Sequence, residues 1–345
     1  MKYRLLKWLA CPKCGGESFS IEVRKSNHQS VCSSHFIEDV NDGVNLDELS
    51  ETEIEEGALH CQKCSSVYPI LSGIPRMLVG DEGESTHHRK TVFNTASNVW
   101  ENNFLELSAP LYAKDFLGKT VLDLGCGYGR HTYFAARYGA EVIAIDNSED
   151  ALFSAKQNTK NLKHVHFIQA DAANIPIQAQ SVDRLYCYGL LHHVDEPKVV
   201  LSAATDVIRP GGTLSLWVYG PRQGLTLVMN NALRGVSTNM DEKQLVQLSV
   251  LIARFLRVFS HTPYRWFGKI PIAGGILSHL PVHEHHKWPF DVVVADIYDR
   301  LRIPVKHWFT KEELETWYGS SGYSNFSVRR RIRNNETFCS IGYRR

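Results

Sequence analysis

The 345-residue sequence lacks any uninterrupted apolar run of about 18 residues, the length that a membrane-spanning helix requires. It also lacks an excess of one charge, because 38 Lys and Arg residues stand against 37 Asp and Glu residues. No global basic field therefore argues for nucleic-acid binding. The apolar run in the opening segment, MKYRLLKWLACPKC, is too short for a signal peptide. We expect a cytoplasmic protein with no membrane partner.

Cysteine is also scarce, since eight residues in a chain of this length are too few for a disulfide framework. Four of the eight form two CxxC pairs, Cys11 with Cys14 and Cys61 with Cys64. In a reducing compartment such pairs indicate metal binding, and two pairs supply the four thiolates of a closed structural zinc site. The 46 residues between the pairs exceed the usual spacing, so Cys32-Ser-Ser-His35 remains a competing second pair.

The length and the 43% hydrophobic content allow two domains with a sizeable core. We place one domain at residues 1–80, which hold both CxxC pairs, and a second at residues 81–345. Residues 38–56 carry nine acidic residues and no Lys or Arg, and we interpret them as a solvated excursion from the first domain.

Strand-like and helix-like segments alternate along the second domain. Strands are predicted at 120–124, 141–146, 165–171, 183–189 and 213–220, and helices at 94–107, 130–139, 148–159 and 197–207. This alternation predicts an α/β fold with a doubly wound, mostly parallel sheet and helices on both faces. Segments 325–334 and 337–345 add a C-terminal antiparallel hairpin, which closes on a turn at Asn334 and Asn335.

The alternation breaks at Gly220, and residues 221–304 form an insertion before the hairpin. Residues 244–259 are an amphipathic helix in which arginines interrupt the apolar face. We favour a helical lid packed on the domain over a helix that lies on a membrane surface.

The glycine-rich segment VLDLGCGYGR, residues 121–130, is the strongest motif in the chain. Its glycines let the backbone turn sharply and approach a ligand at the carboxyl end of a buried strand. A loop of the GxGxxG type would hold a pyrophosphate there. Asp123, two residues before the first glycine, would repel that group but suits a positively charged ligand amine.

Acidic residues end the next two strands. Asp146 lies 19 residues beyond Gly127, where a carboxylate can bind both hydroxyls of a ribose. Asp171, followed by Ala172, ends the third strand and is placed to meet an adenine ring. Either acid alone could equally well cap a helix, but together on consecutive strand ends they indicate a nucleoside-like ligand.

With these motifs, residues 90 to 345 resemble the class I S-adenosylmethionine-dependent methyltransferases. The resemblance implies a Rossmann-like seven-stranded sheet, a glycine loop around the amino-acid part of the cofactor, and a ribose held by the second strand's acid. Residues 183–191 match the family's fourth strand, and 209–213 match the tight turn before the fifth. The implied cofactor-binding residues are Asp123, Gly125, Gly127, Gly129, Asp146, Asn147, Asp171, Ala172 and Tyr188.

Residues 5 to 79 resemble the small zinc-ribbon activator proteins that partner RNA and protein methyltransferases, with residues 24–57 as an extra insertion. The matching segments are LLKWLACPKCGG and LHCQKCSSVYPILSGIPRML. The resemblance assigns a structural Zn²⁺ to Cys11, Cys14, Cys61 and Cys64 rather than to a site that uses Cys32 and His35.

Three residues are candidates for catalysis. His192 follows the fourth strand, where the family's active-site floor lies, and Asp299 and His307 flank the end of the lid. An imidazole can take a proton from a hydroxyl or an amine near neutral pH. A structural hydrogen bond from His192 to a neighbouring loop is an equally good interpretation. We interpret His283–His286 as solvated and Cys126 as a small filler.

These expectations combine into an S-adenosylmethionine-dependent methyltransferase that acts on a small-molecule acceptor from a biosynthetic or polysaccharide pathway. The aromatic residues of the insertion suit an apolar or aromatic acceptor. Methylation of ribosomal or transfer RNA is the alternative, supported by the zinc ribbon and by the basic run Arg329–Arg333. A non-catalytic scaffold for a partner methyltransferase is a third possibility, which the intact cofactor loop disfavours. The sequence leaves the acceptor and the oligomeric state open.

Overall fold

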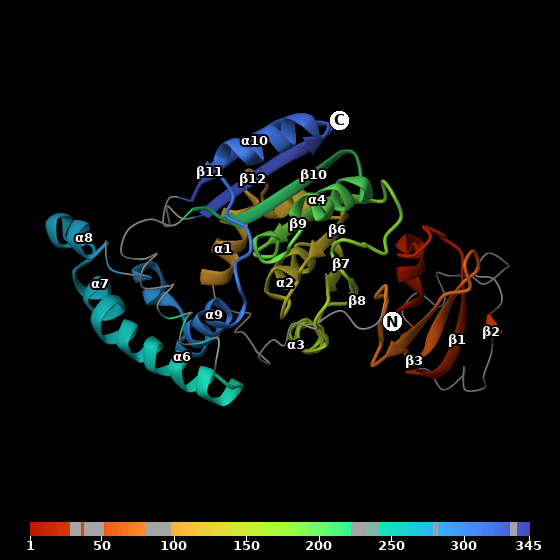
Figure 1. The fold of residues 1–345 in the computed structure, drawn as a ribbon, viewed down its shortest axis with the longest axis horizontal. Coiled ribbons are helices and arrows are strands. Elements are labelled where there is room, and N and C mark those ends of the chain that lie inside the picture. Colours follow the sequence, from red (N-terminus) through yellow and green to blue (C-terminus); the bar gives the residue numbers. More distant parts are fainter. Residues whose placement is uncertain are drawn as a thin grey trace.

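A computed structural model describes residues 1–27, 36–37, 52–80, 98–221, 233, 235, 237, 240–278, 280, 282–331 and 337–345. Several predictions lie outside these residues: the competing pair Cys32 and His35, most of the acidic run, the start of the helix at 94–97, and the turn at Asn334 and Asn335. Figure 1 shows two sheets, with the N-terminal sheet at one end of the molecule. A group of helices projects from the other end.

The N-terminal sheet is antiparallel and has the order β2-β1-β3-β4-β5. Its elements are the 3-10 helix Tyr3–Trp8 and the strands β1 (Phe19–Ser26), β2 (Phe36–Ile37), β3 (Ile54–Cys61), β4 (Val67–Leu71) and β5 (Ile74–Pro75). The first CxxC pair precedes β1, and the second spans the end of β3 and the turn before β4. Because Phe19 pairs with Cys61 in the register of β1 and β3, the two cysteine pairs lie at the same end of the sheet.

The second sheet has seven strands in the order β11-β12-β10-β9-β6-β7-β8. The strands are β6 (Thr120–Leu124), β7 (Glu141–Asp146), β8 (Val165–Gln169), β9 (Val182–Tyr188), β10 (Ile208–Tyr219), β11 (Tyr323–Arg330) and β12 (Thr337–Arg344). β6 to β10 pair in parallel, and the hairpin β11–β12 adds antiparallel to β10. The predicted seven-stranded, mostly parallel fold is confirmed.

Helices lie around this sheet. They are α1 (Asn98–Ser108), α2 (Arg130–Arg137), α3 (Glu149–Asn158), α4 (Pro197–Val207) and α10 (Lys311–Ser320), with short 3-10 turns at Ala113–Phe116 and Leu191–His193. Of these, α2, α3 and α4 connect parallel strands, α1 precedes β6, and α10 leads into β11. The strands beneath them are almost wholly buried, because helices cover both faces of a parallel sheet. The carboxyl ends of β6, β7 and β9 therefore meet at one edge, where polar side chains can converge.

The insertion after β10 is helical. It contains α6 (Glu242–Leu256), a π-helical turn (Arg257–His261), α7 (Thr262–Phe267), α8 (Pro271–Leu277), a 3-10 turn (His283–Lys287) and α9 (Phe290–Arg302). α6 packs against α9 in an apolar cluster of its own, which includes Leu245, Leu256, Val293 and Tyr298. The predicted amphipathic helix is confirmed, and its inner face is packed as a lid would be.

The two ends of the insertion are fastened close together. The Lys306 amide donates to the His192 carbonyl at 2.8 Å, and the Phe309 amide donates to the Tyr219 carbonyl at 2.9 Å. Tyr219 is the last residue of β10, so the chain leaves and rejoins the sheet at nearly one point.

The N-terminal domain docks on the edge strand β8 and the loop that follows it. Leu9 bridges to Ile177, and Arg76 bridges to Gln169 in parallel. Leu9, Ile70, Ile168 and Ile177 belong to one buried apolar cluster that runs through both domains. The two domains thus share a hydrophobic core instead of meeting through a wet interface.

Candidate functional site: the glycine loop, the cavity and the cysteine cluster

The glycine loop follows β6 directly and has the sharp turns that its sequence predicts. Gly125, Gly127 and Gly129 all adopt positive φ angles, of 77°, 52° and 80°. A Cβ atom on Gly125 would lie 2.9 Å from Leu190, and one on Gly129 would lie 2.8 Å from Ala155. A Cβ atom on Gly127 would meet no heavy atom within 4 Å. The outer glycines are therefore needed for packing, and Gly127 leaves open the space where a ligand would approach.

Asp146, at the end of β7, holds this loop in place. Its Oδ2 accepts a hydrogen bond from the Gly127 amide at 2.8 Å, and its Oδ1 accepts one from the Ser148 amide at 2.9 Å. The amides of Gly125 and Cys126 donate to the Ile145 carbonyl. The structure thus brings the predicted ribose-binding acid against the predicted loop.

Asp123 lies one layer deeper than the sequence suggests. Its Oδ2 accepts hydrogen bonds from the Thr132 hydroxyl at 2.6 Å and the Tyr186 hydroxyl at 3.2 Å. Burial raises the pKa of this carboxyl from 3.8 to about 7, and the neighbouring Asp146 adds to the rise. Asp123 supports the loop from below, and its predicted proximity to a ligand amine stays a prediction.

A cavity of about 420 Å³ opens beside the loop. Of the predicted cofactor-binding residues, it is lined by Gly125, Gly127, Asp146, Asn147 and Tyr188. Its volume lies within the range of small-molecule sites. The sheet edge and the loop therefore form one wall of a site large enough for a ligand.

Asp171 and Ala172 are not among the residues that line this cavity. Asp171 is exposed, and its Oδ1 accepts a hydrogen bond from the Ala173 amide at 2.9 Å. Its carbonyl accepts another from the Asn174 amide. These contacts close a turn and do not cap a helix, because the described residues between β8 and β9 form no helix, and contact with an adenine ring stays a prediction.

The insertion supplies the opposite wall. Trp288, Val292, Asp296, Asp299 and Arg300 line the cavity from α9 and the turn before it. Asp296 and Arg300 form an ion pair at 2.8 Å along one face of α9. This wall combines an indole ring with charged groups, so it can bind a molecule that is partly aromatic and partly polar.

Of the three predicted catalytic residues, the structure brings only Asp299 to the cavity. His192 is fully buried, its ring stacks on Tyr219 with centroids 3.8 Å apart, and its Nδ1 accepts from the Tyr219 amide. His307 hydrogen-bonds Glu313 through Nε2 at 2.9 Å. His193, the neighbour of His192, lines the cavity instead. The catalytic roles of His192 and His307 stay predictions.

Two buried histidines in the cavity wall were not among the predicted site residues. His131 follows the glycine loop on α2, and burial lowers the pKa of its imidazole well below 6.5. His285 comes from the insertion and stacks on Trp288 at 3.5 Å, and burial lowers its pKa in the same way. Because a lowered pKa favours the uncharged imidazole, both rings can accept a hydrogen bond. For His131, the signal was its place just after the loop, at the start of a helix that faces the ligand.

The structure supports the interpretation of Cys126 and contradicts that of the histidine run in the insertion. Cys126 is buried and burial raises the pKa of its thiol well above 9, which agrees with a filler role. His285 is buried, so the interpretation of the His283–His286 run as solvated is wrong for this member. His283 and His286 pack their rings against Tyr264.

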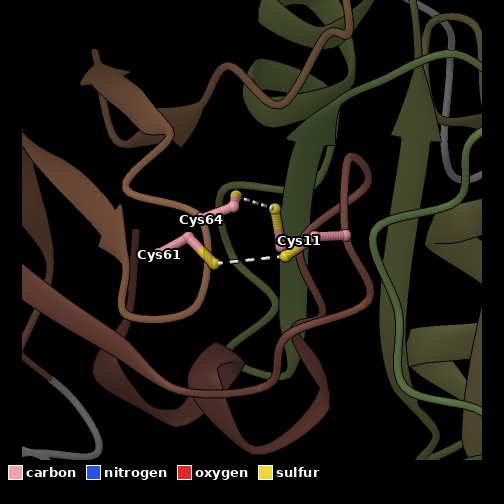
Figure 2. Close-up of side chains that lie close together, drawn as sticks. Cys11, Cys61 and Cys64 are labelled. Carbon is pink, nitrogen blue, oxygen red and sulfur yellow. Dashed lines mark hydrogen bonds between the residues drawn. The ribbon is translucent and has the colours of Figure 1, made fainter.

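The four cysteines of the two CxxC pairs come together. Their sulfur atoms all lie within 4.8 Å of one another, and they are the one such group of metal-binding side chains in the described part of the chain. Cys11 Sγ lies 3.6 Å from Cys64 Sγ, and Cys14 Sγ lies 3.6 Å from Cys61 Sγ. Figure 2 shows Cys61 and Cys64 facing Cys11 across the gap between the two loops.

The surroundings of the cysteines fit a metal ion. A tetrahedral Zn²⁺ with Zn–S bonds of about 2.3 Å holds its sulfurs about 3.8 Å apart, close to the spacing seen here. A Cβ atom on Gly16 would lie 3.2 Å from Cys61 Sγ and 3.3 Å from Cys14 Sγ, so glycine leaves room for the cluster. The Tyr68 hydroxyl lies 3.0 Å from Cys11 Sγ and orients that sulfur from outside.

Comparison with known families agrees with this division. The family model described as "Methyltransferase domain" matches residues 122–216, and the model described as "Trm112p-like protein" matches residues 2–73. The chain thus joins an N-terminal Trm112p-like zinc-ribbon domain to a methyltransferase domain. Both predicted resemblances are confirmed.

Curated relatives are similar to part of the chain. A ubiquinone biosynthesis O-methyltransferase of Hydrogenovibrio crunogenus is 31% identical over 141 residues, which are 37% of this chain and 56% of that protein. An uncharacterised Synechococcus protein is 27% identical over 237 residues, which are 64% of this chain and 51% of the relative. The chain therefore spans about half the length of the curated relatives it matches.

Solved structures with a similar fold include the magnesium protoporphyrin IX methyltransferase of Synechocystis with bound S-adenosylhomocysteine. That likeness has a TM-score of 0.42 at 15% identity and covers 72% of this chain and 83% of that one. The complex of the Haloferax volcanii Trm112 methyltransferase activator with a methyltransferase matches at a TM-score of 0.41 and 15% identity, over 71% of this chain and 88% of that one.

Proposed function

We propose that the protein transfers the methyl group of S-adenosylmethionine to a small-molecule acceptor. The observation that carries this proposal is the glycine loop locked to Asp146 on one wall of a cavity whose other wall is the insertion. The match to the methyltransferase model over residues 122–216 and the similarity to ubiquinone biosynthesis O-methyltransferases support it.

The cofactor belongs in the half of the cavity beside the sheet. Asp146 is placed to bind the ribose, since its carboxylate already ends β7 at the loop and lines the cavity. The positive-φ glycines let the loop backbone approach the amino-acid part of the cofactor. Asn147 and Tyr188 line the same half. Asp171 and Ala172, which lie off this cavity, are proposed at its adenine end from the family resemblance alone.

The acceptor belongs in the half beside the insertion. The cofactor would supply its methyl group to a nucleophilic atom held there, and the sulfur would keep the electron pair of the broken carbon–sulfur bond as a neutral thioether that needs no proton. Positioning alone can lower such a barrier by about 7 to 11 kcal/mol. A base is required only if the acceptor carries a proton that must leave, and Asp299 is the predicted candidate that lies at the cavity.

RNA methylation has less support than a small acceptor, because the arginines of the basic run that the structure describes contact other groups of the protein. Arg331 donates two hydrogen bonds to the Glu106 carboxylate, at 3.0 and 3.1 Å, and Arg329 donates to the Glu106 carbonyl. Arg330 lies over the Phe338 ring, 5.6 Å from its centroid. Arg329 and Arg331 are thereby occupied within the protein, which leaves exposed Arg330 as the described arginine of the run that can reach a phosphate.

The four cysteines are proposed to hold one structural Zn²⁺. Four thiolates leave no open coordination position, so the ion would stabilise the ribbon rather than take part in methyl transfer. One zinc per chain by elemental analysis is the expected result.

The experiment for the activity uses radiolabelled S-adenosylmethionine with a cell extract separated into small-molecule, RNA and protein fractions. We expect the label to appear in the small-molecule fraction. Label in RNA would establish the alternative, and no label in any fraction, with the cofactor still bound, would indicate a scaffold. Calorimetric titration with a nicotinamide dinucleotide is the control for cofactor identity, and tight binding of that ligand would overturn the assignment.

A further inference from the structure

The outer surface of the insertion is apolar and exposed. Its large side chains include Leu251, Phe255, Phe259, Trp266, Ile272 and Ile276, and Trp266 and Ile272 are 71% and 81% exposed. We name this surface, on α6 to α8, the outer face. Single exposed apolar residues are ordinary, but a contiguous group of this size marks an interaction site.

Helix periodicity separates the outer face from the packed one. Leu245, Ala253 and Leu256 of α6 are buried against α9, whereas Leu251 and Phe255 point the other way. The Phe255 and Phe259 rings contact each other, with centroids 4.6 Å apart. The outer face is therefore a second apolar surface and not a loosely packed part of the core.

This segment carries a net positive charge. Residues 241–278 contain five Lys and Arg residues and two acids, Asp241 and Glu242 at the start of α6, in a chain whose formal net charge is +1. Arg254, Arg265 and Lys269 are exposed beside the apolar side chains. A partner surface must therefore accept aromatic and aliphatic groups and also carry negative charge.

We propose that the outer face docks the protein on the surface of an anionic lipid bilayer. Trp, Phe and Ile side chains enter the headgroup boundary while Arg and Lys meet lipid phosphates, as in amphipathic helices that lie in the interface. A symmetric pair of outer faces would bring two net-positive surfaces together, with the acids confined to the start of α6. The bilayer satisfies both features, and a second copy satisfies only the apolar one.

The geometry indicates a helix that lies on the membrane rather than one that crosses it. The continuous helical run Glu242–Phe267 has 26 residues and a mean hydropathy of 1.2 over its most apolar 18-residue stretch, long and apolar enough to span. A third of that stretch (33%) is buried, and its inner face is packed on α9. Figure 1 shows α6 to α8 projecting at the end opposite the zinc ribbon, where a flat surface can reach them.

This proposal departs from our sequence-based expectation, which favoured a lid and no membrane partner. The structure makes the two roles compatible, because α9 lines the cavity while α6, packed on its back, carries the outer face. Docking does not depend on which acceptor is methylated.

The test is co-sedimentation of the full chain with vesicles of phosphatidylglycerol and phosphatidylcholine, and with vesicles of phosphatidylcholine alone. We expect binding to the anionic vesicles that weakens as salt is raised. The variant Phe259→Ser/Trp266→Ser/Ile272→Ser and the variant Arg254→Gln/Arg265→Gln/Lys269→Gln should each weaken binding at least tenfold. Quenching of Trp266 fluorescence by brominated acyl chains, absent in Trp266→Phe, should show insertion of the indole.

The matched control is Leu117→Ser/Val199→Ser, which removes two exposed apolar side chains from the methyltransferase domain and should bind like the wild type. Unchanged circular dichroism and melting temperature would show that the variants fold. No binding to anionic vesicles would overturn the proposal, as would equal binding by the triple variants. A concentration-dependent dimer that Phe259→Ser/Trp266→Ser/Ile272→Ser abolishes, without vesicle binding, would instead establish a second copy as the occupant.

Discussion

The zinc ribbon and the insertion both attach to the same sheet, but they do so in different ways. The ribbon shares its apolar core with the sheet and reaches the cofactor half of the site, where Arg76 hydrogen-bonds Gln169 and Gln169 hydrogen-bonds the Asn147 carbonyl. The insertion keeps a core of its own and lines the acceptor half. Loss of the ribbon should therefore lower the stability of the protein and its affinity for the cofactor, whereas changes in the insertion should alter turnover.

The largest effect is expected from the cysteines. The variant Cys61→Ser/Cys64→Ser should lose its zinc, whose binding in such sites is worth on the order of 10 kcal/mol. Residues 1–80 should become sensitive to proteases. Because Ile168 and Ile177 lose their cover, the melting temperature of the methyltransferase domain should fall as well.

Cys32→Ser is the control for this experiment and should keep a full complement of zinc. If the double variant kept its zinc, Cys32 and His35 would have to be the second pair of zinc ligands. If the domain's melting temperature were unchanged, the shared core would contribute little.

Asp123, which lies in the sheet and belongs to neither region, tests the stability of the sheet itself. Burial raises the pKa of Asp123 to about 7 in the folded state, above its value of 3.8 in the unfolded chain. The folded protein therefore keeps this proton to higher pH, and the free energy of unfolding falls as pH rises from about 4 to about 7. Asp123→Asn should remove this slope and gain a few kcal/mol over the wild type at pH 8. The prediction would be contradicted if the melting temperatures of the wild type and the variant differed by the same amount at every pH from 4 to 8.

At the boundary between cofactor and loop, Asp146→Ala should weaken S-adenosylmethionine binding by about 1 to 3 kcal/mol, the cost of a lost charge-assisted hydrogen bond. The Gly127 amide also loses its acceptor, so loop order should fall with affinity. Calorimetric titration measures the change. Wild-type affinity in the variant would show that Asp146 does not bind the ribose.

On the insertion side, Asp299→Asn should lower turnover tenfold or more while cofactor affinity stays nearly unchanged. His192→Ala and His307→Ala are the comparison, since sequence placed them in catalysis and the structure places them off the cavity lining. Turnover from pH 6 to pH 9, with the labelled acceptor fraction, distinguishes the roles. A base variant loses the pH dependence of the rate, and a positioning variant keeps its shape. Wild-type turnover in all three would mean that proximity alone suffices.

The smallest effect tests the link from the ribbon to the cofactor half. Arg76→Ala should weaken cofactor binding by about 0.5 to 1 kcal/mol, because it removes the hydrogen bond to Gln169 and the ion pair with Glu149. Arg24→Ala is the matched control, since Arg24 pairs with Glu22 inside the ribbon. Equal effects from the two variants would show that Arg76 does not connect the ribbon to cofactor binding.

The sequence allowed correct prediction of those features that depend on the spacing of residues close together in the chain. The glycine loop and Asp146 could be found because the ends of neighbouring parallel strands converge, and the cysteine cluster because CxxC turns present two sulfurs each. His131 was missed, and His285 was misinterpreted as solvated, because their burial in the cavity wall depends on how the insertion folds back over the sheet. Spacing alone also could not show that Asp123 points into the core or that His193, rather than His192, faces the cavity.

The insertion begins and ends against the same residues, His192 and the last residue of β10, Tyr219. A segment whose two ends meet in this way can be exchanged as a cassette, because a short loop would close the same gap without altering any strand pairing. The acceptor wall is thus separable by recombination from the cofactor wall. Grafting the corresponding segment of a related enzyme between Gly220 and Pro304 would transfer acceptor preference while leaving S-adenosylmethionine affinity where it was.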